Sequence, residues 1–199
     1  MLSLIGLARI NYLAYLQVVH YLRYRPSRHT RLIAKVCERI ERGELKRVMF
    51  FLPPRHSKSM TVTESFPSWF IGKNPNRRVI EVSYGESLAQ RFGRANRRKI
   101  ENFGNLLFDI EMARDNSSVT NWSIEGYDGG MISAGVGGPL SGQGADCLII
   151  DDPCKNRQEA NSPTYREMLW DEYRNTLLTR LQPNASIILI QTRWHEDDL

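Results

Sequence analysis

Short apolar runs alternate along this chain with longer stretches of helical periodicity. Runs of mostly apolar residues predict buried strands at residues 48–52, 79–83, 131–134, 147–151 and 186–190. Apolar positions at helical spacing predict helices over residues 30–42, 59–70, 86–103 and 163–180. Strands that are apolar throughout and alternate with helices are typical of a parallel sheet covered on both faces. The pattern therefore predicts an α/β fold, a three-layer sandwich with a mostly parallel sheet.

The first 22 residues form the most apolar stretch, and Arg9 and Asn11 interrupt it. A charge within a segment of marginal length disfavours a membrane span, and no small-residue cleavage site follows, which disfavours a signal peptide. We expect a helix that packs on the domain or on a partner. Residues 104–130 are polar and predict short strands and loops. We divide the chain into an N-terminal helical segment, 1–44, and a core, 45–199.

Composition adds modest constraints. A chain of 199 residues is long enough for one domain with a sizeable core. The net charge of +5 is a slight bias toward polyanionic partners and does not by itself indicate nucleic-acid binding. The three cysteines lack the spacing of a zinc site, which favours a reduced, intracellular protein.

Arginines are concentrated in the helix expected over 86–103. Arg91, Arg94 and Arg98 recur at helical spacing, beside Arg97 and Lys99. Such a face can follow a DNA backbone, meet a neighbouring subunit, or simply be solvated. The solvated face is the favoured interpretation.

The segment 47–59 runs from an apolar strand through two prolines into a basic turn. Lys58 and Ser59 follow that turn, as in the phosphate loop G-x-x-x-x-G-K-[ST]. In such a loop backbone amides surround phosphates, the lysine neutralises their charge and the hydroxyl reaches Mg²⁺. Leu52 and Ser57 occupy the two glycine positions, however. An ordinary helix start with an exposed lysine is the alternative, and the loop alone does not decide.

Two acids end the apolar run at 147–151. Asp151 at the strand tip is a candidate Mg²⁺ ligand, and Asp152 can orient or deprotonate a water. The alternative is a turn after a buried strand, with Asp152 and Pro153 starting a loop. Because Lys58 is also present, the metal interpretation is favoured.

Polar residues also end the strand expected at 186–190. Thr192 and its neighbours can sense a γ-phosphate, or can simply mark the exit from the strand. Arg55 and Arg193 are candidates to contact phosphate oxygens, or else are solvated surface arginines. In parallel sheets ligands gather at the carboxyl ends of the strands. Three such ends with suitable polar groups therefore favour a nucleotide site.

Several segments resemble, in order, those of the large terminase subunits of tailed bacteriophages. The similar segments are residues 52–60, 82–92, 141–153, 159–163 and 191–199. The first looks like that family's phosphate loop, the third like its acidic strand and glycine-rich approach, and the last like its coupling segment. Each motif is loose, but the ordered set, from about Arg25 to the last residue, is specific.

The resemblance implies a P-loop NTPase fold of the ASCE type and an ATP-hydrolysing, Mg²⁺-dependent motor. Such a motor drives double-stranded DNA through a portal protein into a procapsid. It implies a small terminase subunit and a homo-oligomeric ring as further partners, and no membrane. The expected location is the host bacterial cytoplasm, at the procapsid portal.

The resemblance also implies residue roles. Lys58 and Ser59 would bind phosphate and Mg²⁺, and Asp151 would complete the metal site. Asp152 takes the place of the catalytic carboxylate, and Thr192 that of the residue coupling hydrolysis to movement. The nucleotide-binding loop would comprise Pro54, Arg55, His56, Ser57, Lys58 and Ser59, with Arg55 as the arginine that contacts phosphate.

Two departures from the family pattern are visible. Asp152 stands where the family more generally has Glu, and the chain ends directly after the coupling segment. We therefore expect no nuclease activity from this chain, because the family's nuclease domain would follow Leu199. A helicase-like DNA-translocating ATPase and a truncated prophage remnant without turnover remain alternative functions.

Overall fold

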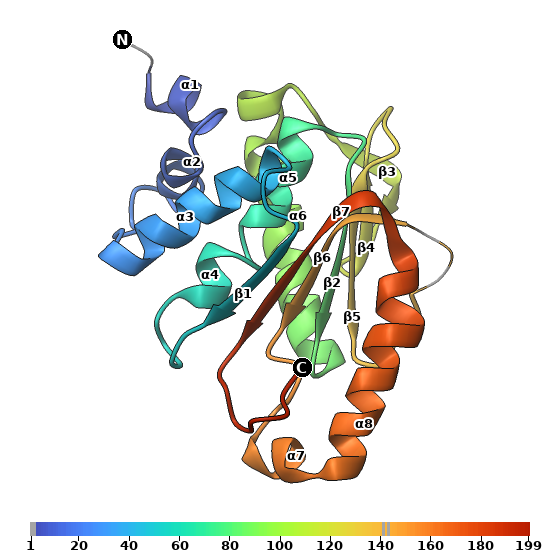
Figure 1. Ribbon diagram of the computed structural model, residues 1–199. Coiled ribbons are helices and arrows are strands. Elements are labelled where there is room, and N and C mark those ends of the chain that lie inside the picture. The colour runs from blue at the N-terminus through green and yellow to red at the C-terminus, as the bar shows by residue number, and fades with distance from the viewer. Residues whose placement is uncertain (1–2, 141, 143) are drawn as a thin grey trace.

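The computed structural model describes residues 3–140, 142 and 144–199, and within them one seven-stranded sheet lies at the centre (Figure 1). The strand order is β1-β7-β6-β2-β5-β4-β3. The strands are β1 Arg47–Phe51, β2 Arg78–Ser83, β3 Met112–Ser117, β4 Asn121–Ile124, β5 Gly130–Gly135, β6 Ala145–Asp151 and β7 Leu181–Gln191. All neighbours from β1 to β5 pair in parallel, and β4 and β3 add an antiparallel end. The predicted α/β class with a mostly parallel sheet is confirmed.

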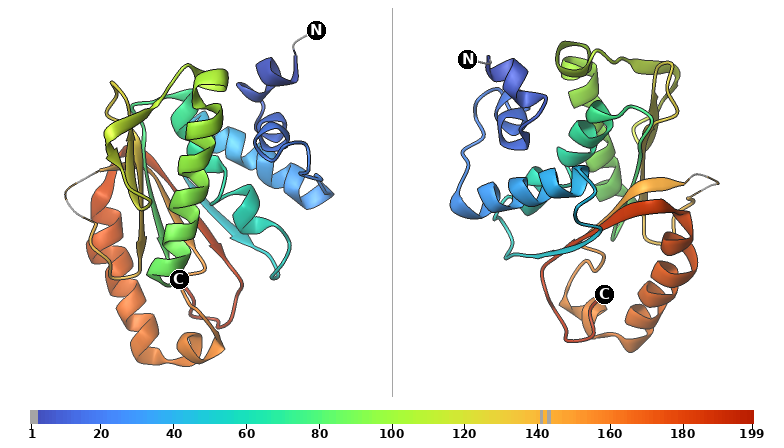
Figure 2. Two further views of the ribbon diagram at one scale, coloured as in Figure 1. Left: turned by 180° about the vertical axis from the view of Figure 1, so that it is seen from behind. Right: turned by 45° about the horizontal axis from the view of Figure 1, so that its top comes forward.

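Helices cover both faces of the sheet (Figures 1 and 2). One face carries α1 Leu4–Ala8, α2 Tyr12–Val19, α3 Arg28–Glu41, α4 Lys58–Thr61, α5 Phe66–Lys73 and α6 Glu86–Phe108. The other carries α7 Arg157–Asn161 and α8 Pro163–Glu172, which continues through a π-helical turn, Tyr173–Leu177, and a 3-10 turn, Leu178–Arg180. The result is the predicted three-layer sandwich.

The central strands bury both faces because their side chains alternate between two cores. On β6, Cys147 and Ile149 belong to the core beneath α6, whereas Leu148 and Ile150 belong to the core beneath α8. This double burial explains the continuous apolar run. The edge strand β1 differs from the prediction, because none of its residues is fully buried and only Val48 and Phe50, on one face, are half-buried. Met49 is 62% exposed and Phe51 is 44% exposed.

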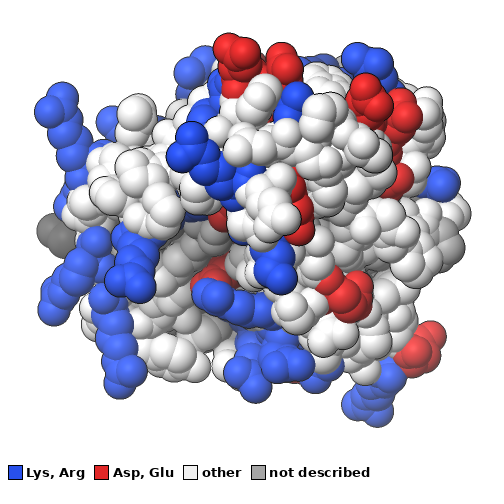
Figure 3. Space-filling view, turned by 90° about the horizontal axis from the view of Figure 1, so that it is seen from below, with Lys and Arg blue, Asp and Glu red and all other residues white. Residues whose placement is uncertain are grey.

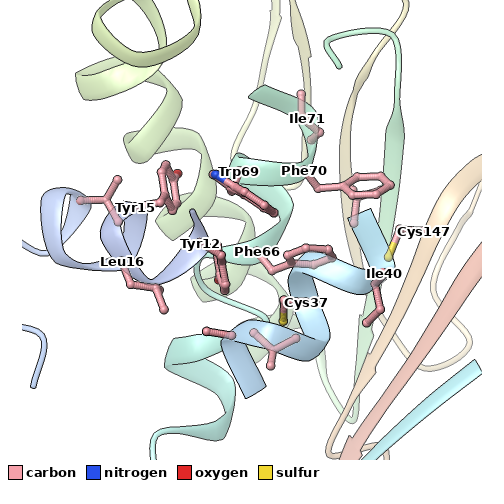
Figure 4. Packing of buried hydrophobic residues seen from close by; sticks show 14 of the residues in the cluster. Tyr12, Tyr15, Leu16, Cys37, Ile40, Phe66, Trp69, Phe70, Ile71 and Cys147 are labelled. Atoms are coloured by element: carbon pink, nitrogen blue, oxygen red, sulfur yellow. The ribbon is translucent and has the colours of Figure 1, made fainter. Parts of the chain in front are cut away.

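The apolar N-terminus forms two helices where the sequence predicted one. The break lies before Tyr12, where the Asn11 side chain accepts a hydrogen bond of 2.8 Å from the amide of Ala14 and caps α2. Figure 4 shows side chains of α2 packed against those of α5. The rings of Tyr12 and Trp69 lie 5.0 Å apart, and Tyr12 Oη donates to the carbonyl oxygen of Thr61 at 2.5 Å. The N-terminal helices thus support the segment that follows the basic loop. No helix in the described part of the chain is long and apolar enough to cross a membrane.

The prediction of a single helix over 59–70 is wrong, because the chain forms two helices, α4 and α5, with a turn between them. Pro67 lies in the first turn of α5. Proline lacks the N–H that would bond to the carbonyl of residue 63, and its ring clashes with that carbonyl in a continuous helix. The turn allows Thr63 and Glu64 to face the ends of the sheet strands.

Candidate nucleotide site

The three predicted strand ends meet at one edge of the sheet, around a cavity of about 510 Å³. Figure 3 looks onto this edge and shows a hollow with basic side chains around it. The cavity is lined by Pro54, Arg55, Ser57, Lys58, Ser59, Met60, Glu64, Tyr84, Arg91, Asp152, Cys154, Lys155, Thr192 and Trp194. Most of the residues predicted from the sequence therefore lie in one place.

The loop between β1 and α4 adopts a glycine-like backbone without glycine. Arg55 has φ of 63° and Ser57 has φ of 59°, both in the left-handed region. For a residue with a Cβ this conformation costs about 1–2 kcal/mol. Ser57 occupies one of the glycine positions of the standard motif and keeps the backbone that glycine would adopt.

Lys58 connects two of the predicted site residues. Its side chain is 7% exposed, and its Nζ donates to Asp152 Oδ1 at 2.7 Å and to Thr192 Oγ1 at 2.9 Å. The backbone amide of Thr192 also donates to Asp152 Oδ1, at 3.2 Å. The ends of β6 and β7 are thus tied to the basic loop through one ammonium group.

Asp151 is fully buried at the end of β6. Thr63 Oγ1 donates to its Oδ2 at 2.5 Å, and no described residue donates a hydrogen bond to its Oδ1. Burial raises the pKa of this carboxyl to about 6 and the charge of Asp152 adds to the rise, while Thr63, Ser59 and Lys58 oppose it. The carboxyl is therefore mostly ionised at neutral pH.

A buried carboxylate oxygen without a donor fits a cation ligand. Mg²⁺ prefers oxygen ligands and typically takes only one or two carboxylates beside phosphate oxygens and waters. Asp151 and the adjacent hydroxyl of Ser59 meet that need. The described residues contain no cluster of three or more His, Cys, Asp or Glu side chains that could hold a metal. A Mg²⁺ site with one or two carboxylates does not require such a cluster, because phosphate oxygens and waters supply the other ligands.

The remaining predicted residues lie around this centre. Arg55 is exposed and lines the cavity, whereas His56 does not line it. The His56 ring has Nδ1 2.9 Å from the carbonyl oxygen of Pro54. Arg193 lies outside the lining, with its guanidinium 5.3 Å from the centre of the Phe51 ring.

The sequence did not identify Thr63, Glu64 or Arg91 as site residues. Thr63 holds Asp151, and the ion pair between Arg91 Nη2 and Glu64 Oε1, 2.5 Å long, lies on the cavity wall. Thr63 lies in the turn between α4 and α5, outside both helices, so helical spacing from Ser59 does not account for its position. The ion pair joins segments far apart in sequence and had no local signal.

The arginine-rich face of α6 is not a continuous basic surface. Arg91 pairs with Glu64, and Arg97 Nε donates to Glu101 at 2.9 Å. Lys99 is buried and donates to the carbonyl oxygen of Glu64 at 2.6 Å. Its inclusion with the surface arginines was wrong, because it lies on the core side of the helix.

Comparison with known proteins identifies a family for this chain. No curated protein compared with the chain matches it. The family model described as terminase large subunit, T4likevirus-type, N-terminal, matches residues 49–199. That span contains all the cavity-lining residues and most of the chain. The chain therefore belongs to the family of terminase large subunits of the T4likevirus type, of which it carries the N-terminal part.

Proposed function

We propose that this chain is the ATP-hydrolysing part of a motor that packages double-stranded DNA into a procapsid. The observation that carries the proposal is the contact of Lys58 with Asp152 and Thr192 beside the buried carboxylate of Asp151. Membership in the terminase family supports a packaging role. The portal protein, a small terminase subunit and further copies of this chain are the partners that such a role implies, in the host cytoplasm.

Binding of the triphosphate would rest on the basic loop. An ammonium group has three N–H donors, and Asp152 and Thr192 accept two hydrogen bonds from Lys58. The third is available to a phosphate oxygen, and Arg55 on the cavity wall adds a second positive charge. Asp151 and Ser59 would hold Mg²⁺, which when bound neutralises charge on the phosphates.

Asp152 is the residue that can orient or deprotonate the attacking water. Its Oδ1 is held by Lys58 and by the amide of Thr192, and its side chain is 32% exposed on the cavity wall. A carboxylate held through one oxygen presents the other to a water in the cavity. Asp152 is shorter than the glutamate usual in the family. The attacking water would therefore lie close to the loop that begins at Asp152.

Replacement of Lys58 by alanine tests the proposal. Loss of a charged phosphate-binding group at the reaction centre is expected to lower phosphate release by about 10²–10³-fold. Lys46→Ala is the matched control, because Lys46 is exposed and bonds to Asn184 away from the cavity. Unchanged turnover in Lys58→Ala would remove the assignment.

Two further outcomes separate the alternatives. Wild-type protein that binds ATP without hydrolysing it, even with DNA and partner proteins present, would be a remnant and not a motor. Separation of the strands of a labelled duplex during turnover would assign the chain to the helicase-like class, since packaging moves an intact duplex.

A further inference from the structure

A row of cations runs along the exposed face of α3. Arg28, Arg31 and Lys35, here called the α3 stripe, are all exposed and lie three and four residues apart. Residues at this spacing share one face of a helix. With a rise of 1.5 Å per residue, the stripe spans about 10 Å.

The α3 stripe has no acidic partner among the described residues. The two glutamates of the same helix are committed elsewhere: Glu38 accepts from the amide of Tyr12 at 2.8 Å, and Glu41 pairs with Arg77 at 3.2 Å. Arg91 and Arg97 of α6 differ, because each pairs with a glutamate, whereas Arg94 and Arg98 of that helix are exposed and have no ion pair among the described residues. The positive charge of the α3 stripe is uncompensated within the described structure.

The α3 stripe lines a surface hollow close to the basic loop. The hollow, of about 660 Å³, is lined by Arg28, His29, Arg31, Leu32 and Lys35. His29 Nε2 lies 3.1 Å from the carbonyl oxygen of His56, which places α3 against the loop. Figure 3 shows basic side chains projecting along the flank that carries the N-terminal helices, with no acidic side chains among them.

We propose that the α3 stripe binds the phosphate backbone of double-stranded DNA. A duplex carries one negative charge per 1.7 Å of its axis, so a 10 Å row of cations meets several phosphates. Arginine forks match phosphate oxygens in geometry. A protein partner fits less well, because protein interfaces have an apolar centre and the stripe offers only the exposed Leu32.

Backbone contacts carry no sequence information, so the binding should be independent of DNA sequence, as packaging of a whole genome requires. The choice of DNA as the polyanion rests on the proposed function. The surface itself rests on the exposed and unpaired cations.

The test is fluorescence anisotropy with a labelled duplex over a series of NaCl concentrations. The variant Arg28→Gln/Arg31→Gln/Lys35→Gln should bind more weakly at low salt. Its slope of log K against log salt should be shallower by about 2.7, which is about 0.9 for each lost phosphate contact. The matched control Arg94→Gln/Arg98→Gln/Arg114→Gln removes the same formal charge from exposed positions that do not line the hollow on α3, and it should keep the wild-type slope.

Three results would overturn the inference: no duplex binding by the wild type, equal loss of slope in both triple variants, or an unchanged slope in the stripe variant. Altered self-association with an unchanged slope would reassign the stripe to a subunit contact. If the triple variant fails to fold by circular dichroism, Arg31→Gln alone should lower the slope by about 0.9. ATP turnover of the wild type and Lys58→Ala is measured without DNA, so failure of the proposed ATPase is seen separately.

Discussion

Glu81 carries a carboxyl group in the middle of the sheet, on the strand next to the one that ends in Asp151. It is fully buried on β2, its Oε1 accepts a hydrogen bond from the hydroxyl of Ser83, and its Oε2 has no partner among the described residues. Burial raises its pKa to about 8 and the charge of Asp151 adds to the rise, while the hydroxyls of Ser83 and Ser133 oppose it. We therefore expect Glu81 to be protonated in the folded protein at neutral pH.

The raised pKa makes the free energy of unfolding depend on pH. Between the unfolded value of 4.5 and the folded value of about 8, the folded chain binds more protons than the unfolded chain. The stability from neutral Glu81 is therefore complete below 4.5 and is lost as pH rises through about 8. With 1.36 kcal/mol per pKa unit, the loss between about pH 6 and about pH 8 is about 2 kcal/mol.

The variant Glu81→Gln removes this proton and keeps the shape of the side chain. Urea unfolding at several pH values should show that wild type loses about 2 kcal/mol more than Glu81→Gln over that range. Glu125→Gln is the control, because it removes the same kind of carboxyl from an exposed position. Equal pH dependence in wild type and Glu81→Gln would refute the reasoning, since it would mean that Glu81 ionises as easily in the fold as in water.

Three further substitutions probe the site and its support. Thr63→Val removes the hydroxyl that holds Asp151, and a titration of turnover against Mg²⁺ should show apparent metal affinity at least about 10-fold weaker, with Thr63→Ser restoring it. Ser57→Gly should keep ATP turnover, whereas Ser57→Val should abolish nucleotide binding, because a β-branched residue is strained at φ of 59°; the opposite order would contradict the loop geometry. Trp69→Ala should lower the free energy of unfolding by about 3–5 kcal/mol in urea, whereas Trp194→Ala, at a residue 39% exposed, should leave it nearly unchanged.

The sequence predicted best where one structural cause dominated. The runs at 147–151 and 186–190 are apolar because β6 and β7 are buried on both faces. A short run that is apolar throughout is typical of such a strand. Parallel pairing then brings their carboxyl ends to one edge. That edge is where Lys58, Asp152 and Thr192 meet. The predicted parallel sheet places all three at this edge, and the strand order β1-β7-β6, which the sequence did not predict, makes them neighbours.

The sequence failed where a contact from a distant segment decides. Lys99 is polar in sequence, but its ammonium reaches a backbone carbonyl exposed by the turn between α4 and α5. That turn arises in part from Pro67, which cannot donate a hydrogen bond to the carbonyl of residue 63. The apolar positions at helical spacing hid this break in the sequence. The burial of Glu81 likewise depends on α6 and on neighbouring strands, so its position within the run at 79–83 gave no sign of a raised pKa.

Thr192 joins Lys58 to the ends of two sheet strands. Its hydroxyl accepts from Lys58 at 2.9 Å and donates to the carbonyl oxygen of Leu52 at 3.3 Å, so it joins the end of β7 to the end of β1. A hydrogen bond from a charged donor contributes about 1.5–3 kcal/mol. On the proposed function, a phosphate oxygen at the third N–H of Lys58 would share the ammonium charge with Thr192 and weaken this bond, and coupling between sites typically amounts to about 1–3 kcal/mol. On the proposed function, phosphate binding at Lys58 would therefore bias the contact that joins the ends of β7 and β1.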